Sequence, residues 1–426
     1  MTLVLVGFVV FLLMGMPVAF AIGISGFLFF IQQPSLPFTM PAQLILSETQ
    51  NWALLAIPMF IFAGNLLNNT GITSRLMRLA SVLAGHMYGG LAQTSVVLST
   101  LMGGVSGSAI ADASMQSRIL GHEMVKRGYA RGYAAGINGF SALITVAIPP
   151  GIGLVLYGSI GEVSIGRLFA AGIAPGFLMM CFLMIAVAIT ARKRGYTPEH
   201  SRPKSFKVIL SSFLGSIWAL LFPVILIVGL RMGFLVPSEA GACASVYAIF
   251  VGIAVYRELT WEKFISAIKL TILDVGMIMF LIALSSLISY GITWEMIPQL
   301  LSTFLLTLSE NKNIITTLVL LFLLFLGMVV DSTVIILLLT SILVPIMSQI
   351  GVDLVYFGVI MVVTCAVGLL TPPVGVSMYS VCSILECSVG DYVKESWPFF
   401  LALVILIVFL VFFPSVVLVI PNLIFG

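Results

Sequence analysis

Two proline pairs in matching surroundings constrain this chain more than any other feature. Residues 148–151 read Ile-Pro-Pro-Gly and residues 371–374 read Thr-Pro-Pro-Val, so that Pro149 and Pro372 lie 223 positions apart. Each pair interrupts a long apolar segment. Proline breaks or kinks a helix because it has no backbone N–H and its ring clashes with the preceding turn. We therefore predict one helical unit that occurs twice and is broken at the same place in both copies.

The repeat extends beyond the prolines. At the same offset, Thr94, Gly104, Pro150 and Pro175 match Thr317, Gly327, Pro373 and Pro398. Repeats that are detectable mainly by pattern are typical of secondary transporters. The pattern predicts a first half over residues 1–191 and a second half over residues 236–426. A cytoplasmic loop and a linking helix over residues 192–235 would join them.

Composition indicates where such a chain folds. Hydrophobic residues make up 60% of it and charged residues 8%, whereas about a quarter of the residues in a soluble globular protein are charged. We predict an all-helical polytopic membrane protein in a lipid bilayer. The net charge of +3 is too small to argue for nucleic-acid binding. The apolar start has no basic region before it, which favours a retained first helix over a signal peptide.

Basic residues predict the orientation, because Lys and Arg mark the cytoplasmic side of a membrane protein. They crowd residues 192–207 and flank the segment between residues 75 and 131, so both places are expected to be cytoplasmic. The predicted crossings lie near residues 3–31, 52–70, 132–160, 168–191, 209–230, 238–256, 266–291, 354–386 and from 397. These nine crossings put the N-terminus in the cytoplasm and the C-terminus outside, and the single linking helix inverts the second half.

Two further apolar segments are predicted to be re-entrant hairpins. Residues 91–123 have basic flanks and a glycine-rich interruption at residues 103–108, and residues 313–350 have a similar turn at residues 327–333. Irregular backbone at membrane depth survives only where protein or water shields it. Each hairpin precedes a broken helix, over residues 132–160 and 354–386 respectively.

The breaks predict a cation site. The carbonyls that the prolines would free are those of Thr145, Val146, Gly368 and Leu369. The hydroxyl groups expected near them are those of Ser106, Ser108, Ser332 and Thr371. Clusters of neutral oxygens suit a small hard cation such as sodium better than a transition metal. The alternative is that the prolines only kink helices and the small residues only let them pack.

Several motifs together resemble the large membrane subunit of tripartite ATP-independent periplasmic (TRAP) transporters. They are Gly-Val-Ser-Gly-Ser-Ala-Ile-Ala-Asp at 104–112, Arg-Gly-Tyr at 127–129, Ile-Pro-Pro at 148–150, Pro-Ser-Glu-Ala at 237–240, Leu-Thr-Pro-Pro-Val-Gly at 370–375 and Pro-Phe-Phe at 398–400. The resemblance covers essentially the whole chain. It implies an elevator-type secondary transporter of the bacterial inner membrane, driven by a sodium gradient. Such a transporter takes an organic anion, a carboxylate or an acidic sugar such as sialic acid, from a periplasmic binding protein and works with a small four-helix membrane subunit.

The resemblance also implies which residues bind sodium. The first site would comprise Ser106, Ser108, Thr145 through its carbonyl, Ile148 and Pro150, and the second would comprise Gly327, Gly368 and Thr371. Asp112 and Asp331 are further candidates for ion binding or gating, because an ionised residue inside a membrane is costly and usually functional. For Asp331 the alternative is hydrogen bonding within the hairpin turn.

Two other functions compete with this interpretation. A sodium/divalent-anion symporter would share the hairpins and the inverted repeats but would need no binding protein. An intramembrane enzyme would use Asp112 or Asp331 as a catalytic acid, yet these two residues occupy non-equivalent repeat positions and lack the paired motif of such an active site. The sequence contains no nucleophile–base pair, phosphate loop or metal-binding cluster. We therefore predict neither enzymatic activity nor an organic cofactor, and the sequence does not identify the anion.

Overall fold

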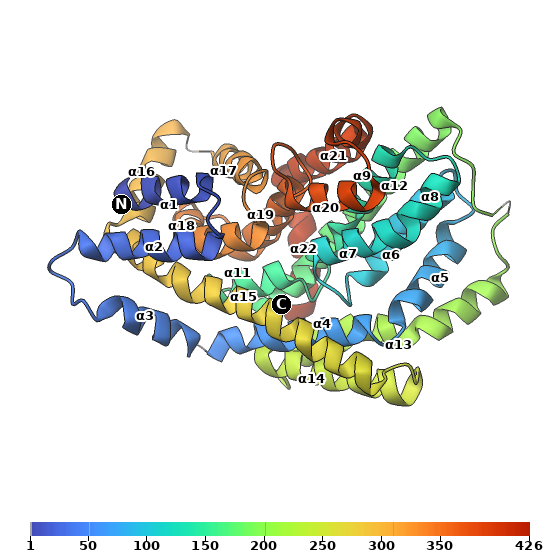
Figure 1. The fold of residues 1–426 in the computed structure, drawn as a ribbon, viewed down its shortest axis with the longest axis horizontal. Coiled ribbons are helices and arrows are strands. Elements are labelled where there is room, and N and C mark those ends of the chain that lie inside the picture. The colour runs from blue at the N-terminus through green and yellow to red at the C-terminus, as the bar shows by residue number, and fades with distance from the viewer. Residues whose placement is uncertain (1, 51, 201, 310) are drawn as a thin grey trace.

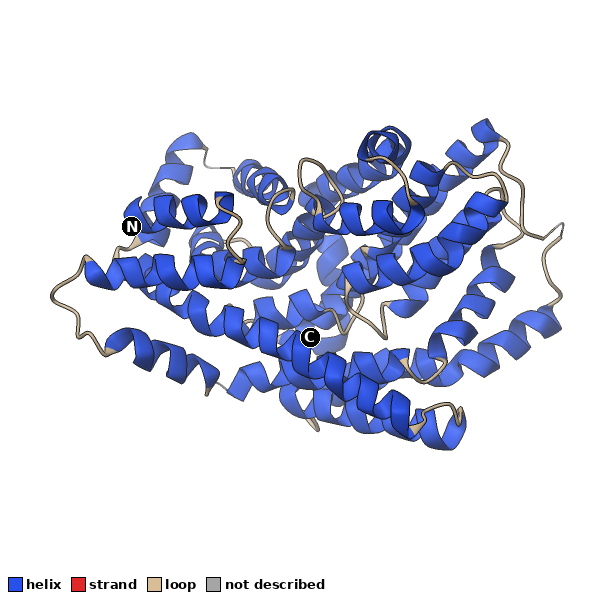
Figure 2. Cartoon of the chain, in the orientation of Figure 1, coloured by secondary structure: helices blue, strands red, loops and turns tan. Residues whose placement is uncertain are grey.

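The computed structural model describes residues 2–50, 52–200, 202–309 and 311–426. All regular elements in these residues are helices (Figure 2). The first part of the chain forms α1 (Thr2–Leu13), α2 (Val18–Ile31), α3 (Met40–Thr49), η1 (Trp52–Leu55), α4 (Ala56–Asn68), α5 (Ile72–Ala84), α6 (Gly90–Met102), α7 (Ala109–Gln116), η2 (Ser117–Gly121), α8 (His122–Lys126), α9 (Arg131–Ala142), α10 (Ile144–Ala147), α11 (Ile152–Ile160) and α12 (Ile165–Arg194). The rest forms α13 (Phe206–Arg231), α14 (Pro237–Phe250), η3 (Val251–Val255), α15 (Trp261–Trp294), α16 (Ile297–Leu308), α17 (Lys312–Gly327), α18 (Ser332–Ile350), α19 (Leu354–Gly368), α20 (Val376–Leu385), α21 (Val389–Phe412) and α22 (Pro414–Phe425).

Membrane-spanning length is reached by fewer helices than the nine predicted crossings. In the described residues, six helices are long and apolar enough to cross a membrane, or up to eight if each of two bent pairs counts as one span. One bent pair consists of α9–α10 and α11, which meet at an angle of 42°. The all-helical, multi-span fold class is confirmed, and the count of nine is not.

The first predicted crossing, residues 3–31, is wrong as a single helix. The chain turns at Gly15, whose φ is +79°, and α2 begins after Pro17. The helices α1 and α2 have 12 and 14 residues, or roughly 18 and 21 Å at 1.5 Å per residue, which is short for a bilayer core of about 30 Å. They lie side by side, since a Cβ atom on Gly7 would be 3.0 Å from Leu28 Cδ1.

The two hairpins pack against the two broken helices. The first hairpin consists of α6 and α7, whose facing sides are bridged by Gln116 to Ser95 (2.8 Å) and Ser99 (2.8 Å). The second consists of α17 and α18, and its base is closed by Lys312 Nζ, which donates to the Gly351 carbonyl at 2.9 Å. We call these helices together with α9–α11 and α19–α20 the hairpin group.

Beside the hairpin group lie α2, α4, α14 and α15, which we call the four-helix group (Figure 1). In this group α2 packs against α15, and α14 packs against α4. Both contacts are close because of glycine: a Cβ atom on Gly26 would lie 2.6 Å from Leu287 Cβ, and one on Gly241 would lie 2.7 Å from Met59 Cβ. The predicted repeat relates α2 to α14 and α4 to the end of α15, so these contacts would be equivalent. The inverted relation and its residue boundaries remain predictions.

Candidate ion and substrate site

The tip of the first hairpin is shaped by a left-handed glycine and a helix cap. Gly107 has a φ of +64°, which a residue with a side chain rarely adopts. Ser108 then caps α7, with its Oγ accepting from the Ala111 N–H at 3.5 Å, while its own N–H donates to Ser106 Oγ at 3.3 Å. A Cβ atom on Gly107 would lie 2.4 Å from the Pro150 carbonyl oxygen. The tip therefore rests directly on the first helix break.

At this break two carbonyls are open. Among the described residues, no donor forms a hydrogen bond with the carbonyl of Thr145 or Val146, because the prolines that follow have no N–H. The Thr145 hydroxyl donates to the Ala142 carbonyl at 2.8 Å, which leaves its lone pairs available. Ile148 packs on the tip, since a Cβ atom on Gly103 would lie 2.6 Å from Ile148 Cβ. The residues predicted for the first site are thus brought together.

Asp112 completes this cluster. Asp112 is only 2% exposed, and its side chain lies next to those of Ser106 and Thr145. Its Oδ2 atom nevertheless has no hydrogen-bond partner among the described residues. A buried carboxylate is costly unless a cation or hydrogen-bond donors compensate its charge. A carboxylate surrounded by hydroxyl and carbonyl oxygens is a ligand set for a hard cation.

The second predicted site lies where the tip of the second hairpin meets the break between α19 and α20. The backbones touch, since a Cβ atom on Gly368 would lie 2.5 Å from the Gly327 carbonyl carbon. The Met328 carbonyl at the tip accepts the N–H groups of Val374 and Gly375, each at 3.0 Å. Thr371 Oγ1 donates to the Val367 carbonyl at 2.9 Å. The structure therefore brings Gly327, Gly368 and Thr371 to one junction.

One prediction about this second break is wrong. The Gly368 carbonyl accepts the Thr371 N–H at 2.9 Å, and the Leu369 carbonyl accepts the N–H groups of Ser377 (3.1 Å) and Met378 (3.3 Å). The chain turns back on itself after the prolines, and the first turn of α20 supplies new donors. These two carbonyls are therefore not left free.

Asp331 lies at the tip of the second hairpin as the N-cap of α18. Its Oδ1 atom accepts the Thr333 N–H at 2.8 Å, so the hydrogen bonding within the turn that we considered as an alternative is present. Ser108 occupies the same capping position on α7. The two residues that the repeat aligns are thus both helix N-caps, although Ser108 accepts from the third residue after it and Asp331 from the second.

A central cavity of about 770 Å³ lies between the hairpin tips and the four-helix group. Its lining includes Asn65, Asn68, Ser106, Gly107, Ser108, Ala109, Ile110, Ala111, Val146, Asp274, Met277, Asp331, Ser332, Thr333, Val334 and Leu369. No Lys, Arg or His is among the described residues that line it. The first residues of α7 and α18 face the cavity, and helix N-termini offer unpaired N–H groups and a positive dipole to an anion.

Asp274 is a cavity residue that the sequence analysis missed. It lies in the middle of the 34-residue helix α15, and its Oδ2 atom accepts a hydrogen bond from Asn65 Nδ2 of α4 at 3.1 Å. The sequence contains a signal for this residue, because an acidic side chain in a long apolar segment is a candidate functional residue by default.

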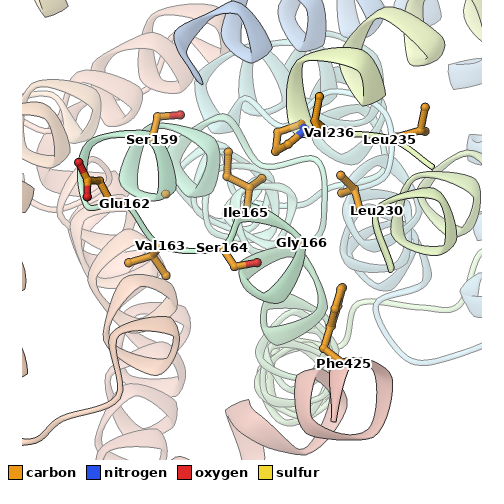
Figure 3. Close-up of a pocket in the computed structure, with 12 residues that line it drawn as sticks. Ser159, Glu162, Val163, Ser164, Ile165, Gly166, Leu230, Leu235, Val236 and Phe425 are labelled. Carbon is orange, nitrogen blue, oxygen red and sulfur yellow. The ribbon is translucent and has the colours of Figure 1, made fainter. Parts of the chain in front are cut away.

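A second cavity, of about 510 Å³, lies elsewhere (Figure 3). The turn between α11 and α12 lines it with Glu162, and the turn between α13 and α14 lines it with Leu235 and Val236. None of its lining residues belongs to a hairpin tip or a helix break. The central cavity is therefore the candidate functional site.

Comparison with known proteins assigns the family. The sequence profile of the tripartite ATP-independent periplasmic transporter, DctM component, matches residues 5–416. The chain belongs to this family. It is thus the large permease component of a TRAP transporter, a multi-pass membrane protein of bacteria and not an enzyme. The interpretation of Asp112 and Asp331 as catalytic acids is not retained.

Named relatives cover nearly the whole chain. The sialic acid TRAP transporter large permease protein SiaM of Vibrio cholerae is 35% identical over 99% of this chain and 98% of its own. The 2,3-diketo-L-gulonate TRAP transporter large permease protein YiaN of Escherichia coli is 33% identical over 95% of both chains. The isethionate TRAP transporter permease protein DctMQ of Oleidesulfovibrio alaskensis is 31% identical over 96% of this chain but only 64% of its own.

Solved structures share the fold. The YdaH transporter of Alcanivorax borkumensis superposes with a TM-score of 0.63 over 87% of each chain, at 12% identity. MtrF of Neisseria gonorrhoeae superposes with a TM-score of 0.59 over 86% of this chain and 83% of its own, at 13% identity. At such identities the likeness concerns the fold alone.

Proposed function

We propose that this permease carries an organic anion into the cell together with sodium ions, after a periplasmic binding protein has delivered the anion. The substrates in the names of the relatives, sialic acid, diketogulonate and isethionate, are all organic anions. The N-terminal ends of α7 and α18 at the central cavity support the same substrate class, because they offer N–H groups to a negative charge.

The observation that carries the sodium proposal is the buried carboxylate of Asp112 with its unpaired Oδ2 atom. Sodium at this place would be bound by Asp112, by the hydroxyls of Ser106 and Thr145, and by the open carbonyls of the first break. Ser108, Ile148 and Pro150 would hold the tip and the break in position. This donor set is hard and singly charged, which suits sodium better than a transition metal.

The second sodium site is proposed at the contact of Gly327 with Gly368, next to Thr371. The backbone approach there requires glycine on both sides, which supports a site built from main-chain oxygens. Because Leu369 and Asp331 line the central cavity, a cation at this junction would also lie near a bound anion. Its charge would then stabilise the anion directly.

For the transport step we propose an elevator mechanism, in which the hairpin group moves against the four-helix group. The close contact of Gly64 on α4 with the tip supports a sliding surface, since a Cβ atom there would lie 3.3 Å from the Val105 carbonyl oxygen. We further propose that a small four-helix membrane subunit completes the fixed part. Some relatives, such as DctMQ, are longer than this chain, and their additional residues would contain such a component. The N-terminus would be cytoplasmic and the C-terminus periplasmic in the inner membrane.

Reconstituted permease with the small subunit and the binding protein tests the proposal. An inward sodium gradient should drive accumulation of the anion, and Asp112→Asn should abolish most of it, because the mutation removes the only charged ligand of the first site. Equal uptake in potassium buffer would contradict sodium coupling. Undiminished uptake without the binding protein would instead favour a binding-protein-independent anion symporter.

A further inference from the structure

The carboxylate of Asp274 is fixed on the part of the central cavity's wall that α15 contributes. Asn65 Nδ2 donates to Asp274 Oδ2 at 3.1 Å and also contacts Thr271 Oγ1 at 3.2 Å. The Thr271 hydroxyl in turn donates to the Ala267 carbonyl at 2.7 Å. These bonds orient Asn65 and hold one oxygen of the carboxylate. No other described residue donates to Asp274, so its second oxygen is available to a ligand.

The charged side chains that line the cavity are acidic. Two carboxylates, Asp274 and Asp331, line the cavity, and no basic side chain among the described lining residues balances them. Asp331 uses one oxygen, Oδ1, to cap α18 through the Thr333 N–H. Backbone donor groups line the cavity where α7 and α18 begin. We call the backbone N–H groups at the starts of α7 and α18 the donor wall and the part of the wall at Asp274 the acceptor wall.

This polarity discriminates between classes of anion. A carboxylate at the donor wall would leave the far end of the ligand next to Asp274. Hydroxyl groups there would donate to the open oxygen of Asp274, forming charge-assisted hydrogen bonds. A second carboxylate there would meet a like charge, a repulsion that we expect to weaken binding by about ten-fold.

We infer that Asp274, oriented by Asn65, determines specificity: it selects monocarboxylates that carry hydroxyl groups at the far end over dicarboxylates of the same length. This inference rests on the proposed function, because it assumes that the central cavity binds the transported anion. The inference goes beyond the proposed function because it assigns the selection between anions to a residue of the four-helix group.

Ligand-dependent thermal unfolding of the purified, full-length permease tests the inference. Gluconate and adipate serve as probes, since both have six carbons and only adipate has two carboxylates. In sodium buffer, gluconate should raise the unfolding midpoint at concentrations about ten-fold lower than adipate. Asp274→Asn should weaken the binding of gluconate and strengthen the binding of adipate. The ratio of the two effective concentrations should then be close to one. Glu262→Gln, which removes an exposed acid from the same helix, should leave the ratio unchanged.

Three results would overturn the inference: equal binding of both probes by the native protein, no shift with either probe, or an unchanged ratio in Asp274→Asn. Retained stabilisation by sodium alone shows that the variant is folded. If the ratio behaves as expected but potassium replaces sodium without effect, sodium coupling fails while the role of Asp274 stands. The two proposals therefore fail separately.

Discussion

Replacing Gly107 with alanine tests whether the contact between the hairpin tip and the helix break creates the first ion site. A Cβ atom there would lie 2.4 Å from the Pro150 carbonyl oxygen, about 1 Å closer than an ordinary van der Waals contact. The tip or the break must therefore move by roughly that distance. An ion site tolerates displacements of only about 0.5 Å. We expect Gly107→Ala to weaken apparent sodium affinity by about ten- to a hundred-fold, which corresponds to about 1.4–2.8 kcal/mol.

The matched control is Gly128→Ala. Gly128 also has a positive φ, +85°, but nothing lies within 4 Å of the position of its Cβ atom. Both variants incur the backbone penalty of roughly 1–2 kcal/mol for a left-handed residue, and only Gly107→Ala adds the clash. The assay is a sodium titration of the unfolding midpoint, with potassium replacing sodium to keep the ionic strength constant. If both variants show the same sodium dependence, the contact between tip and break does not form the site.

Three further predictions concern the other contacts of the hairpin group. Gly368→Ala should disrupt the second site and lower sodium-driven uptake at least about ten-fold, because its Cβ atom would lie 2.5 Å from the Gly327 carbonyl carbon. The control variant Gly276→Ala should transport normally, because nothing lies within 4 Å of the position of its Cβ atom. Ser106→Ala removes one hydroxyl from the first site and should weaken sodium affinity by about five- to a hundred-fold, or 1–3 kcal/mol; wild-type affinity in a sodium titration would exclude this ligand. Gln116→Ala leaves the buried Ser99 hydroxyl without its bond to Gln116 Nε2, whereas Ser95 keeps Asn138 and Ser141 as partners. The change should cost about 1–3 kcal/mol of stability. That loss should appear equally in sodium-free thermal unfolding.

The sequence predicts helix breaks and tight turns well because they depend on single residues. Proline removes a backbone donor wherever it occurs, so the sequence alone predicts the position of both breaks. The turn of the first hairpin needs a residue with positive φ, and Gly107 supplies it. The cap of α7 by Ser108 follows from the preference of small oxygen-bearing side chains for that position. Each of these features is local and needs no knowledge of the partners.

Predictions from hydropathy alone are weaker. The apolar run from residue 3 to 31 has the composition of one crossing. Only Gly15 and Pro17 mark the turn within it, and they do not interrupt its hydropathy. The helices α5 and α16 were missed, although each lies between a helix of the four-helix group and a hairpin. The partner of Asp274 was also beyond prediction, because Asn65 lies 209 residues away in the sequence.

The two helix breaks show why a sequence repeat does not imply equal chemistry. Proline determines which hydrogen bonds are lost, but the path of the following chain determines which are regained. After the second break, α20 returns donors to the Leu369 carbonyl, whereas the Thr145 and Val146 carbonyls stay open after the first. The first cluster also contains the buried carboxylate of Asp112, while the acid of the second hairpin, Asp331, is occupied as a helix cap. Under the proposed function, the first site would therefore bind sodium through the negative charge of Asp112. The second site would bind sodium most strongly when the anion is present.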